Sequence, residues 1–195
     1  STEDQGDRNV AIGYEALKTQ NVDGNAYNVA VGHSAGKEVT TGTANTIIGG
    51  LAGDALTTGV HNTVVGYAAL TNEDAHGKNV AVGYEALNQQ NAGADAYNVA
   101  VGYEAGASIT TGIVNTIIGG LAGDALTTGQ ANVAIGGEAL SNETDSHSSV
   151  AIGYQALATQ DASSGTNTYN VAVGRSAGLS VTTGVQNTLI GALAG

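Results

Sequence analysis

The chain has 195 residues and a formal net charge of −12, with five lysines and arginines against seventeen aspartates and glutamates. It contains no Cys, Met, Phe, Trp or Pro, which excludes disulfides, thiolate metal sites and a cysteine nucleophile. The acidic balance argues against nucleic acid and anionic membranes as partners, because both require basic patches. Hydrophobic residues make up 42% and are almost all Ala, Val, Ile and Leu, which predicts an interior too narrow for bulky side chains.

No apolar run approaches the roughly 20 residues of a membrane span, so we expect no membrane insertion. No signal peptide is visible, and the first residue is Ser1 instead of Met. We therefore interpret the chain as a processed product or a segment of a longer protein, and favour the segment.

A nine-residue phrase, Asn-[Val/Thr]-[Ala/Ile]-[Ile/Val]-Gly-x-x-Ala-[Leu/Gly], recurs eleven times at intervals of 17 to 21 residues. A unit this short cannot bury its own apolar face and must stack on its neighbours. The sequence therefore predicts an all-β fold, a parallel β-solenoid or β-roll of about eleven coils forming one domain over 1–195. Four-coil super-repeats cover 9–78 and 79–148, and an incomplete one covers 149–195.

Alternation within the first copy, residues 9–17, places Val10, Ile12, Tyr14 and Ala16 on one face of a straight strand. Position four of the phrase is Ile or Val in every copy, and position eight is always Ala. We expect both positions to face the interior of the coil. The invariant glycine at position five indicates a bend or a close backbone approach.

Position one carries asparagine in ten of the eleven copies. Stacked asparagines satisfy one another and the backbone of the turn, so we expect a structural ladder along the axis. Ser149 interrupts this ladder, whose members are Asn9, Asn28, Asn45, Asn62, Asn79, Asn98, Asn115, Asn132, Asn170 and Asn187.

Position six places Tyr67, Tyr84 and Tyr103 on three consecutive coils. Such a stack is a candidate platform for a sugar or protein ligand; the alternative is that the aromatic rings simply cover a glycine-rich strand. Glu85 and Glu104 lie one coil apart, where like charges repel. They either share a cation or extend into water.

Positions three and seven vary together: where position three is Ile or Leu, position seven is Leu, and where position three is Ala, position seven is usually Glu, Gln or Ser. An apolar face present only in some coils indicates an outer face that meets a partner at intervals; the alternative is local repacking of the interior. The candidate chain–chain contacts are Ile47, Leu51, Ile117, Leu121, Leu189 and Leu193.

Position nine is either leucine or glycine. Where it is glycine, an aliphatic residue three places later leads into Thr-Thr-Gly, at Val39, Leu56, Ile109, Leu126 and Val181. Each complete coil thus supplies one aliphatic plug from one of two places. We expect Thr-Thr-Gly to close the coil, with its glycine in a left-handed conformation.

Catalytic signatures are absent, so we expect no enzyme activity and no cofactor. The sequence has no GxSxG, Walker or dinucleotide motif, and its histidines do not recur at ligand spacing: His33, His61, His76 and His147. Asp-rich loops such as Asp23-Gly24-Asn25 leave calcium as the alternative, although the calcium-binding EF-hand loop and β-roll nonapeptide are missing.

The phrase SSVAIG at 148–153 resembles the head repeat of YadA-like trimeric autotransporter adhesins. The longer unit NTIIGGLAGDALTTGVH at 45–61 is similar to repeats of bacteriophage tail-fibre proteins that precede an endosialidase-type chaperone domain. This resemblance implies a left-handed β-roll, a homotrimer and an extracellular location on a virion or cell surface. It implies either a spacer or binding of a cell-surface glycan or protein; the alternative is a bacterial adhesin head that binds host matrix.

Residues 187–195 and 1–8 together would complete one regular coil of 17 residues across a joint between two copies. End-to-end self-stacking into a filament, with one chain covering the exposed strand edge of the next, is therefore a further alternative. A segment cut in register with the repeat explains the same count.

Overall fold

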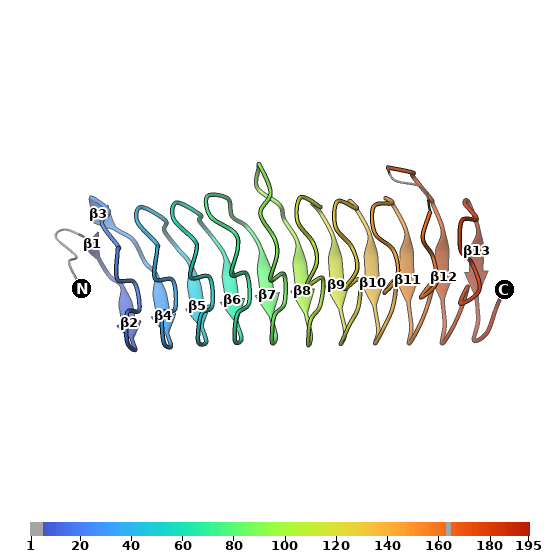
Figure 1. Ribbon diagram of the computed structural model, residues 1–195, viewed down its shortest axis with the longest axis horizontal. Helices are drawn as coiled ribbons and strands as arrows, with labels where there is room; N and C mark the ends of the chain where they lie inside the picture. Colours follow the sequence, from blue (N-terminus) through green and yellow to red (C-terminus); the bar gives the residue numbers. More distant parts are fainter. Residues whose placement is uncertain (1–5, 163–164) are drawn as a thin grey trace.

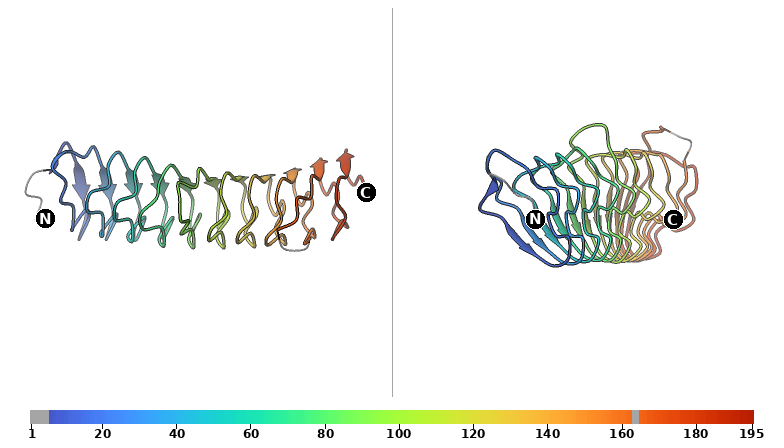
Figure 2. Two further views of the ribbon diagram at one scale, coloured as in Figure 1. Left: turned by 90° about the horizontal axis from the view of Figure 1, so that it is seen from above. Right: turned by 60° about the vertical axis from the view of Figure 1, so that its left-hand side comes forward.

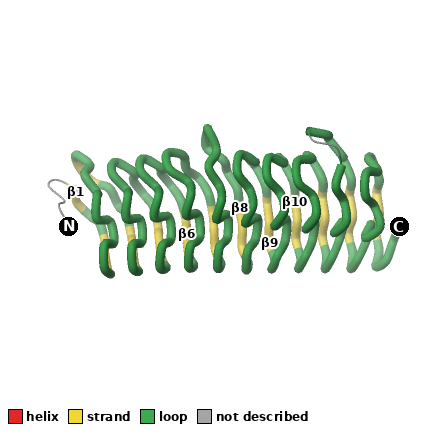
Figure 3. Tube along the Cα trace, viewed as in Figure 1, coloured by secondary structure: helices red, strands yellow, loops and turns green. Residues whose placement is uncertain are grey.

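The computed structural model describes residues 6–162 and 165–195. This part of the chain forms a parallel β-solenoid of about eleven coils, with no helix among the described residues. Successive coils lie side by side along a rod, with the termini at opposite ends (Figure 1). Each coil contains one short strand of the main sheet, and turns and loops make up the rest (Figure 3).

The main sheet has eleven strands in the order β13-β12-β11-β10-β9-β8-β7-β6-β5-β4-β2. A separate parallel pair joins β1 (Gly6–Asp7) to β3 (Gly24–Asn25) at the N-terminal end. The main strands are β2 (Val10–Ile12), β4 (Val29–Val31), β5 (Thr46–Ile48), β6 (Thr63–Val65), β7 (Val80–Val82), β8 (Val99–Val101), β9 (Thr116–Ile118), β10 (Val133–Ile135), β11 (Val150–Ile152), β12 (Val171–Val173) and β13 (Thr188–Ile190).

Strand register follows the repeat without a shift. In β10 and β11, for example, Val133 pairs with Val150 and Ala134 with Ala151. Every neighbouring pair in the sheet joins equivalent positions of the phrase in this way. Equivalent side chains therefore stand above one another in columns, and Figure 2 shows the coils stacked along one axis.

The prediction that position four faces the interior is wrong. The interior residue is position three, the middle of each strand, and Ile47 and Ile117 at this position are fully buried. Its neighbours project to the opposite face because side chains alternate along a strand, so Ile48 is 39% and Ile118 38% exposed. The position-eight alanines do face inward, and those from Ala35 to Ala177 are fully buried.

This orientation also overturns part of the predicted chain–chain contact. Ile47 and Ile117 lie inside the coil and offer no surface to another chain, while Leu189 packs partly buried against the same core in the last coil. The exchange of alanine for isoleucine at position three is therefore a repacking of the interior. The leucines at position seven of the same three coils lie at least partly at the surface: Leu51, Leu121 and Leu193.

One aliphatic plug fills each complete coil, as predicted. A Cβ added to Gly106 would lie 2.9 Å from Cδ1 of Ile109, and one on Gly123 would lie 2.9 Å from Cδ1 of Leu126. The residue three places after position nine, here named position twelve, thus occupies the space that a leucine at position nine fills elsewhere. Where position nine is leucine, position twelve is polar and still buried: Gln20, Glu73, Gln90, Glu143 and Gln160.

Two glycine columns allow the coils to pack closely. A Cβ on Gly102, whose φ is +144°, would lie 2.5 Å from the carbonyl oxygen of Gly119 in the next coil. The glycine of Thr-Thr-Gly is not left-handed, contrary to the prediction. At Gly42 a Cβ would lie 2.5 Å from the carbonyl oxygen of Gly59, so close approach between coils selects glycine there.

Left-handed residues instead turn the chain at position seven, at position nine and directly before position one. In the coils around β7 and β8 these include Glu85, Leu87 and Tyr97, with φ of 51°, 50° and 52°. Left-handed backbone disfavours residues with a Cβ, so the packing of the coils holds these positions in a conformation that their side chains do not favour.

The position-one asparagines form a hydrogen-bonded ladder. The backbone N–H of Asn45 donates to Oδ1 of Asn28 at 2.9 Å, and its Nδ2 donates to the carbonyl of Gly59 at 2.8 Å. The same pattern recurs from Asn98 to Asn132. These bonds satisfy buried amides and tie each turn to its neighbours, which is a structural role.

Candidate functional site

The position-six tyrosines form a stack on the outer surface. Ring centroids of Tyr67 and Tyr84 are 5.6 Å apart with an interplanar angle of 15°, and those of Tyr84 and Tyr103 are 5.3 Å apart at 9°. The middle ring, Tyr84, is 43% exposed, against 51% for Tyr67 and 54% for Tyr103. Neighbouring rings cover each other, so the stack presents its edges, its hydroxyls and its two end faces.

Two carboxylates accompany the stack. A side-chain hydrogen bond with Glu85 raises the pKa of Tyr84 above its ordinary value, and one with Glu104 raises the pKa of Tyr103. The charge of Glu85 also contributes to the raised pKa of Tyr103. Both phenols therefore stay protonated at neutral pH beside negatively charged groups, and this surface favours cations over anions.

The two end faces of the stack differ. Tyr67 covers Gly50, because a Cβ there would lie 3.5 Å from Cδ2 of the Tyr67 ring. At the other end, no atom lies within 4 Å of a Cβ added to Gly120. The prediction that the rings cover glycines therefore holds for Tyr67, whereas the position next to Tyr103 is open.

A second stack lies in the first two coils, where the ring centroids of Tyr14 and His33 are 5.4 Å apart. Its adjacent carboxylate, Glu15, pairs with Lys18 at 2.7 Å and with Lys37 at 3.8 Å. Glu85 and Glu104 make no salt bridge with any described residue. The protein thus neutralises the first aromatic surface with its own lysines and leaves the central one acidic.

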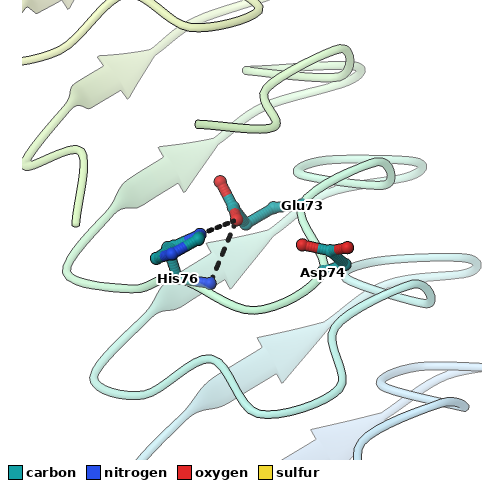
Figure 4. A group of neighbouring side chains, drawn as sticks. All are labelled: Glu73, Asp74 and His76. Carbon is teal, nitrogen blue, oxygen red and sulfur yellow. Dashed lines mark hydrogen bonds and ion pairs between the residues drawn. The ribbon is translucent and has the colours of Figure 1, made fainter. Parts of the chain in front are cut away.

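Glu73, Asp74 and His76 form a group whose potential metal-ligand atoms lie within 4.8 Å of one another (Figure 4). Glu73 is fully buried, and its carboxylate accepts backbone N–H donors from His76 at 3.1 Å and from Ala92 at 3.4 Å. Burial raises the pKa of Glu73, while these two hydrogen bonds oppose the rise. The carboxylate is therefore already engaged in holding the turn together.

Glu143 repeats this arrangement one super-repeat later without a histidine. Its Oε1 accepts the backbone N–H groups of Thr144 and Ser146, both at 3.0 Å. Because the same turn closes with Ser146 in place of His76, the carboxylate at position twelve is a structural feature of this turn. The group around Glu73 therefore gives no support for a metal centre. In the loop at 23–25, which we considered for calcium, Gly24–Asn25 forms β3.

Sequence inspection missed the buried polar residues at position twelve. Gln90, for example, donates from Nε2 to the carbonyl of Thr110 at 3.2 Å and accepts from Nδ2 of Asn98 at 2.6 Å. The available signal was their fixed place: they occur only where position nine is leucine, at the offset that is otherwise aliphatic.

No family model, curated protein or solved structure matches the chain. Within the described residues, no helix is long and apolar enough to cross a membrane. The function is therefore inferred from the residues and geometry of the rod.

Proposed function

We propose that this chain is a rigid, self-associating segment of an extended surface fibre. The observation that carries the proposal is the outer face of the main sheet, which is apolar from the first coil to the last. Position four contributes only Ile and Val to this face: Ile12, Val31, Ile48, Val65, Val82, Val101, Ile118, Ile135, Ile152, Val173 and Ile190.

Position two adds only Val or Thr to the same face, so no charged residue interrupts it. At the usual strand spacing and rise, the two columns cover roughly 50 Å by 10 Å, on the order of 500 Å². An exposed apolar patch of this size matches the largest patch on a typical monomeric protein, and such patches are often functional. A face of constant composition along the whole rod fits a partner with the same repeat, and a second copy of this chain has that repeat.

We infer that three chains assemble through this face, as the resemblance to trimeric adhesin heads and tail-fibre repeats suggests, with left-handed coils. We assign the contact between chains to the Val and Ile residues of positions two and four, because Ile47 and Ile117 are buried within the coil. A fibre of this kind acts outside the cell, on a virion or a bacterial surface, as a spacer or as a receptor-binding element. The tyrosine stack of Tyr67, Tyr84 and Tyr103 is its best binding platform.

Sedimentation equilibrium tests the assembly. We expect a mass of three chains of 19.1 kDa each, constant over a wide concentration range. Ile118→Lys should reduce this to one chain, because it places a charge in the apolar face. The control Ser180→Lys adds the same charge at an exposed position outside that face and should leave the mass unchanged. A monomeric wild type contradicts the proposal, and a mass that grows with concentration favours the end-to-end filament.

A further inference from the structure

We propose that Tyr103 and the open position above Gly120 bind the guanidinium group of an arginine side chain on a protein partner. This proposal rests on the proposed role as a surface fibre and names the chemistry of one contact that it makes.

The ring of Tyr103 has one uncovered face. Tyr67 and Tyr154 both lean over the glycine of the preceding coil, at 3.5 Å from a Cβ on Gly50 and 3.4 Å from one on Gly137. Tyr103 likewise stacks on the preceding Tyr84. The following coil offers only Gly120, which is exposed and has no atom within 4 Å of an added Cβ. A planar group can therefore continue the stack by one step.

Carboxylates lie on the coils before and after this open position. Glu104 precedes it and Glu138 follows it by one coil, and both lie close enough to Asp124 for their charges to raise its pKa, after burial as the main cause. Glu138 is held in place by Gln155, whose Nε2 donates to it at 2.7 Å. No lysine or arginine occurs between Lys78 and Arg175. Glu104 and Glu138 make no salt bridge with any described residue.

A guanidinium group fits this combination better than other cations do. It is planar, it stacks on aromatic faces, and its fork of N–H donors matches carboxylates. The protein itself places cations over tyrosine rings elsewhere: the guanidinium carbon of Arg8 lies 5.5 Å from the ring centroid of Tyr27, and the ammonium Nζ of Lys78 lies 5.1 Å from that of Tyr97. At Tyr103 an arginine from a partner would take that place.

The first super-repeat shows how the position is closed. The counterparts of Tyr103, Gly120 and Gly137 there are His33, Gly50 and Tyr67, and the Tyr67 ring fills the space above Gly50. The counterparts of Glu104 and Glu138 are uncharged, Ser34 and Ala68. Gly137→Tyr therefore reproduces a side chain that this scaffold already accepts, and it should block the position without disturbing the fold.

The test measures binding of a fluorescent Gly/Ser peptide with three alternating arginines, by polarisation at low ionic strength. Matched peptides carry citrulline, the neutral isostere of arginine, or lysine. The proteins are the assembled wild type, Gly137→Tyr, Tyr103→Leu and the control Ala192→Tyr, which adds a tyrosine at position six away from the site. Circular dichroism and sedimentation check that each variant keeps its fold and mass.

We expect the arginine peptide to bind wild type and Ala192→Tyr alike, and Gly137→Tyr and Tyr103→Leu about tenfold more weakly, in line with a desolvated cation–π contact. The lysine peptide should bind less tightly than arginine, and the citrulline peptide should not bind. Equal binding of lysine and arginine, or full binding by Gly137→Tyr, overturns the proposal. If the protein is a trimer that does not bind the arginine peptide, the arginine site is refuted and the proposed assembly stands. If it is a monomer that binds the arginine peptide, the proposed assembly is refuted and the arginine site stands.

Discussion

The interior of the rod and the outer face of its sheet are both apolar, but they vary in opposite ways. Inside, residue size changes from coil to coil: position three is Ala in some coils and Ile in others, and the plug moves between positions nine and twelve. Outside, position four is restricted to Ile and Val, although Ile48 and Ile118 are more than one third exposed.

The difference shows what each surface contacts. The interior of a coil is filled by its own chain, so a change at one position is compensated by its neighbour. β-branched residues favour strands on an exposed face as well, but Thr meets that preference without exposing a wholly aliphatic side chain. Position four never carries Thr. Constant aliphatic character on an exposed face therefore indicates a partner with a constant surface. Mutations can test each side of this contrast separately.

The largest effect is expected where the coils meet through backbone alone. Gly102→Ala forces a side chain into a left-handed conformation and into the carbonyl oxygen of Gly119. Strain and overlap together should lower the free energy of unfolding by about 4 kcal/mol or more. Urea unfolding provides the measurement, and Gly120→Ala in the next coil, where a Cβ meets nothing, should change stability by less than about 0.5 kcal/mol. Equal effects would refute the close-packed glycine column.

Neighbouring residues on opposite faces give the most direct comparison. Ile117→Thr buries a hydroxyl in the coil interior and should cost about 3 kcal/mol of unfolding free energy. Ile118→Thr should cost less than about 0.5 kcal/mol in the monomer but weaken assembly. Urea unfolding of both variants in an Ile152→Lys background, in which the charge in the apolar face should keep the chain monomeric, measures the first effect. Sedimentation of each variant without that change measures the second. If Ile118→Thr were the more destabilising change in the monomer, the assignment of faces would be reversed.

The interchange of plugs can be tested in one coil. Ile109→Ala should lower the unfolding free energy by about 2 kcal/mol, because it leaves a cavity. Adding Gly106→Leu should restore most of the loss, since position three of this coil is Ala100 and a leucine at position nine then fills the same space, as Leu87 does beside Ala81 in the preceding coil. Thermal unfolding of the single and double variants measures the rescue. Additive destabilisation would show that the two positions fill different spaces.

The repeat period predicted much of this fold because stacking requires equal coils. Strand register, the asparagine ladder and the alternating plug all follow from equivalent residues standing above one another. The face that points inward did not follow, because alternation distinguishes inside from outside only when one face is polar. In Val-Ala-Val and Thr-Ile-Ile strands both faces are apolar. Ile or Leu at position three occurs only where position nine is Gly, and this link between the two positions was the signal for the interior.

The candidate site was predictable only in part. The repeat spacing alone predicts one column of aromatic rings, because position six of three consecutive coils is tyrosine: Tyr67, Tyr84 and Tyr103. Which ring face is open depends on the direction in which the side chains lean over Gly50 and Gly137. Such rotamers are set by three-dimensional packing and leave no periodic trace in the sequence.

The smallest expected effect concerns the polar alternative to the aliphatic plug. Burial raises the pKa of Glu73 above its ordinary value of 4.5, against the opposing backbone hydrogen bonds of His76 and Ala92. The folded protein therefore holds this proton more tightly than the unfolded chain does. The resulting stabilisation is fully present below the unfolded pKa and is lost as the pH rises through the folded pKa.

Glu73→Gln should remove this slope, because a neutral amide, which position twelve already carries as Gln20, Gln90 and Gln160, does not titrate. In the wild type, we expect the unfolding free energy to fall by about 1 kcal/mol or less as the pH rises from below the unfolded pKa of Glu73 to above its folded pKa. Urea midpoints recorded from about pH 4 upward provide the measurement. The exposed Asp23→Asn serves as control and should keep the wild-type slope. Parallel curves for wild type and Glu73→Gln would mean that the pKa of Glu73 is the same in the folded and the unfolded protein. Position twelve would then tolerate a charge, and the interior would be less uniformly apolar than its aliphatic plugs indicate.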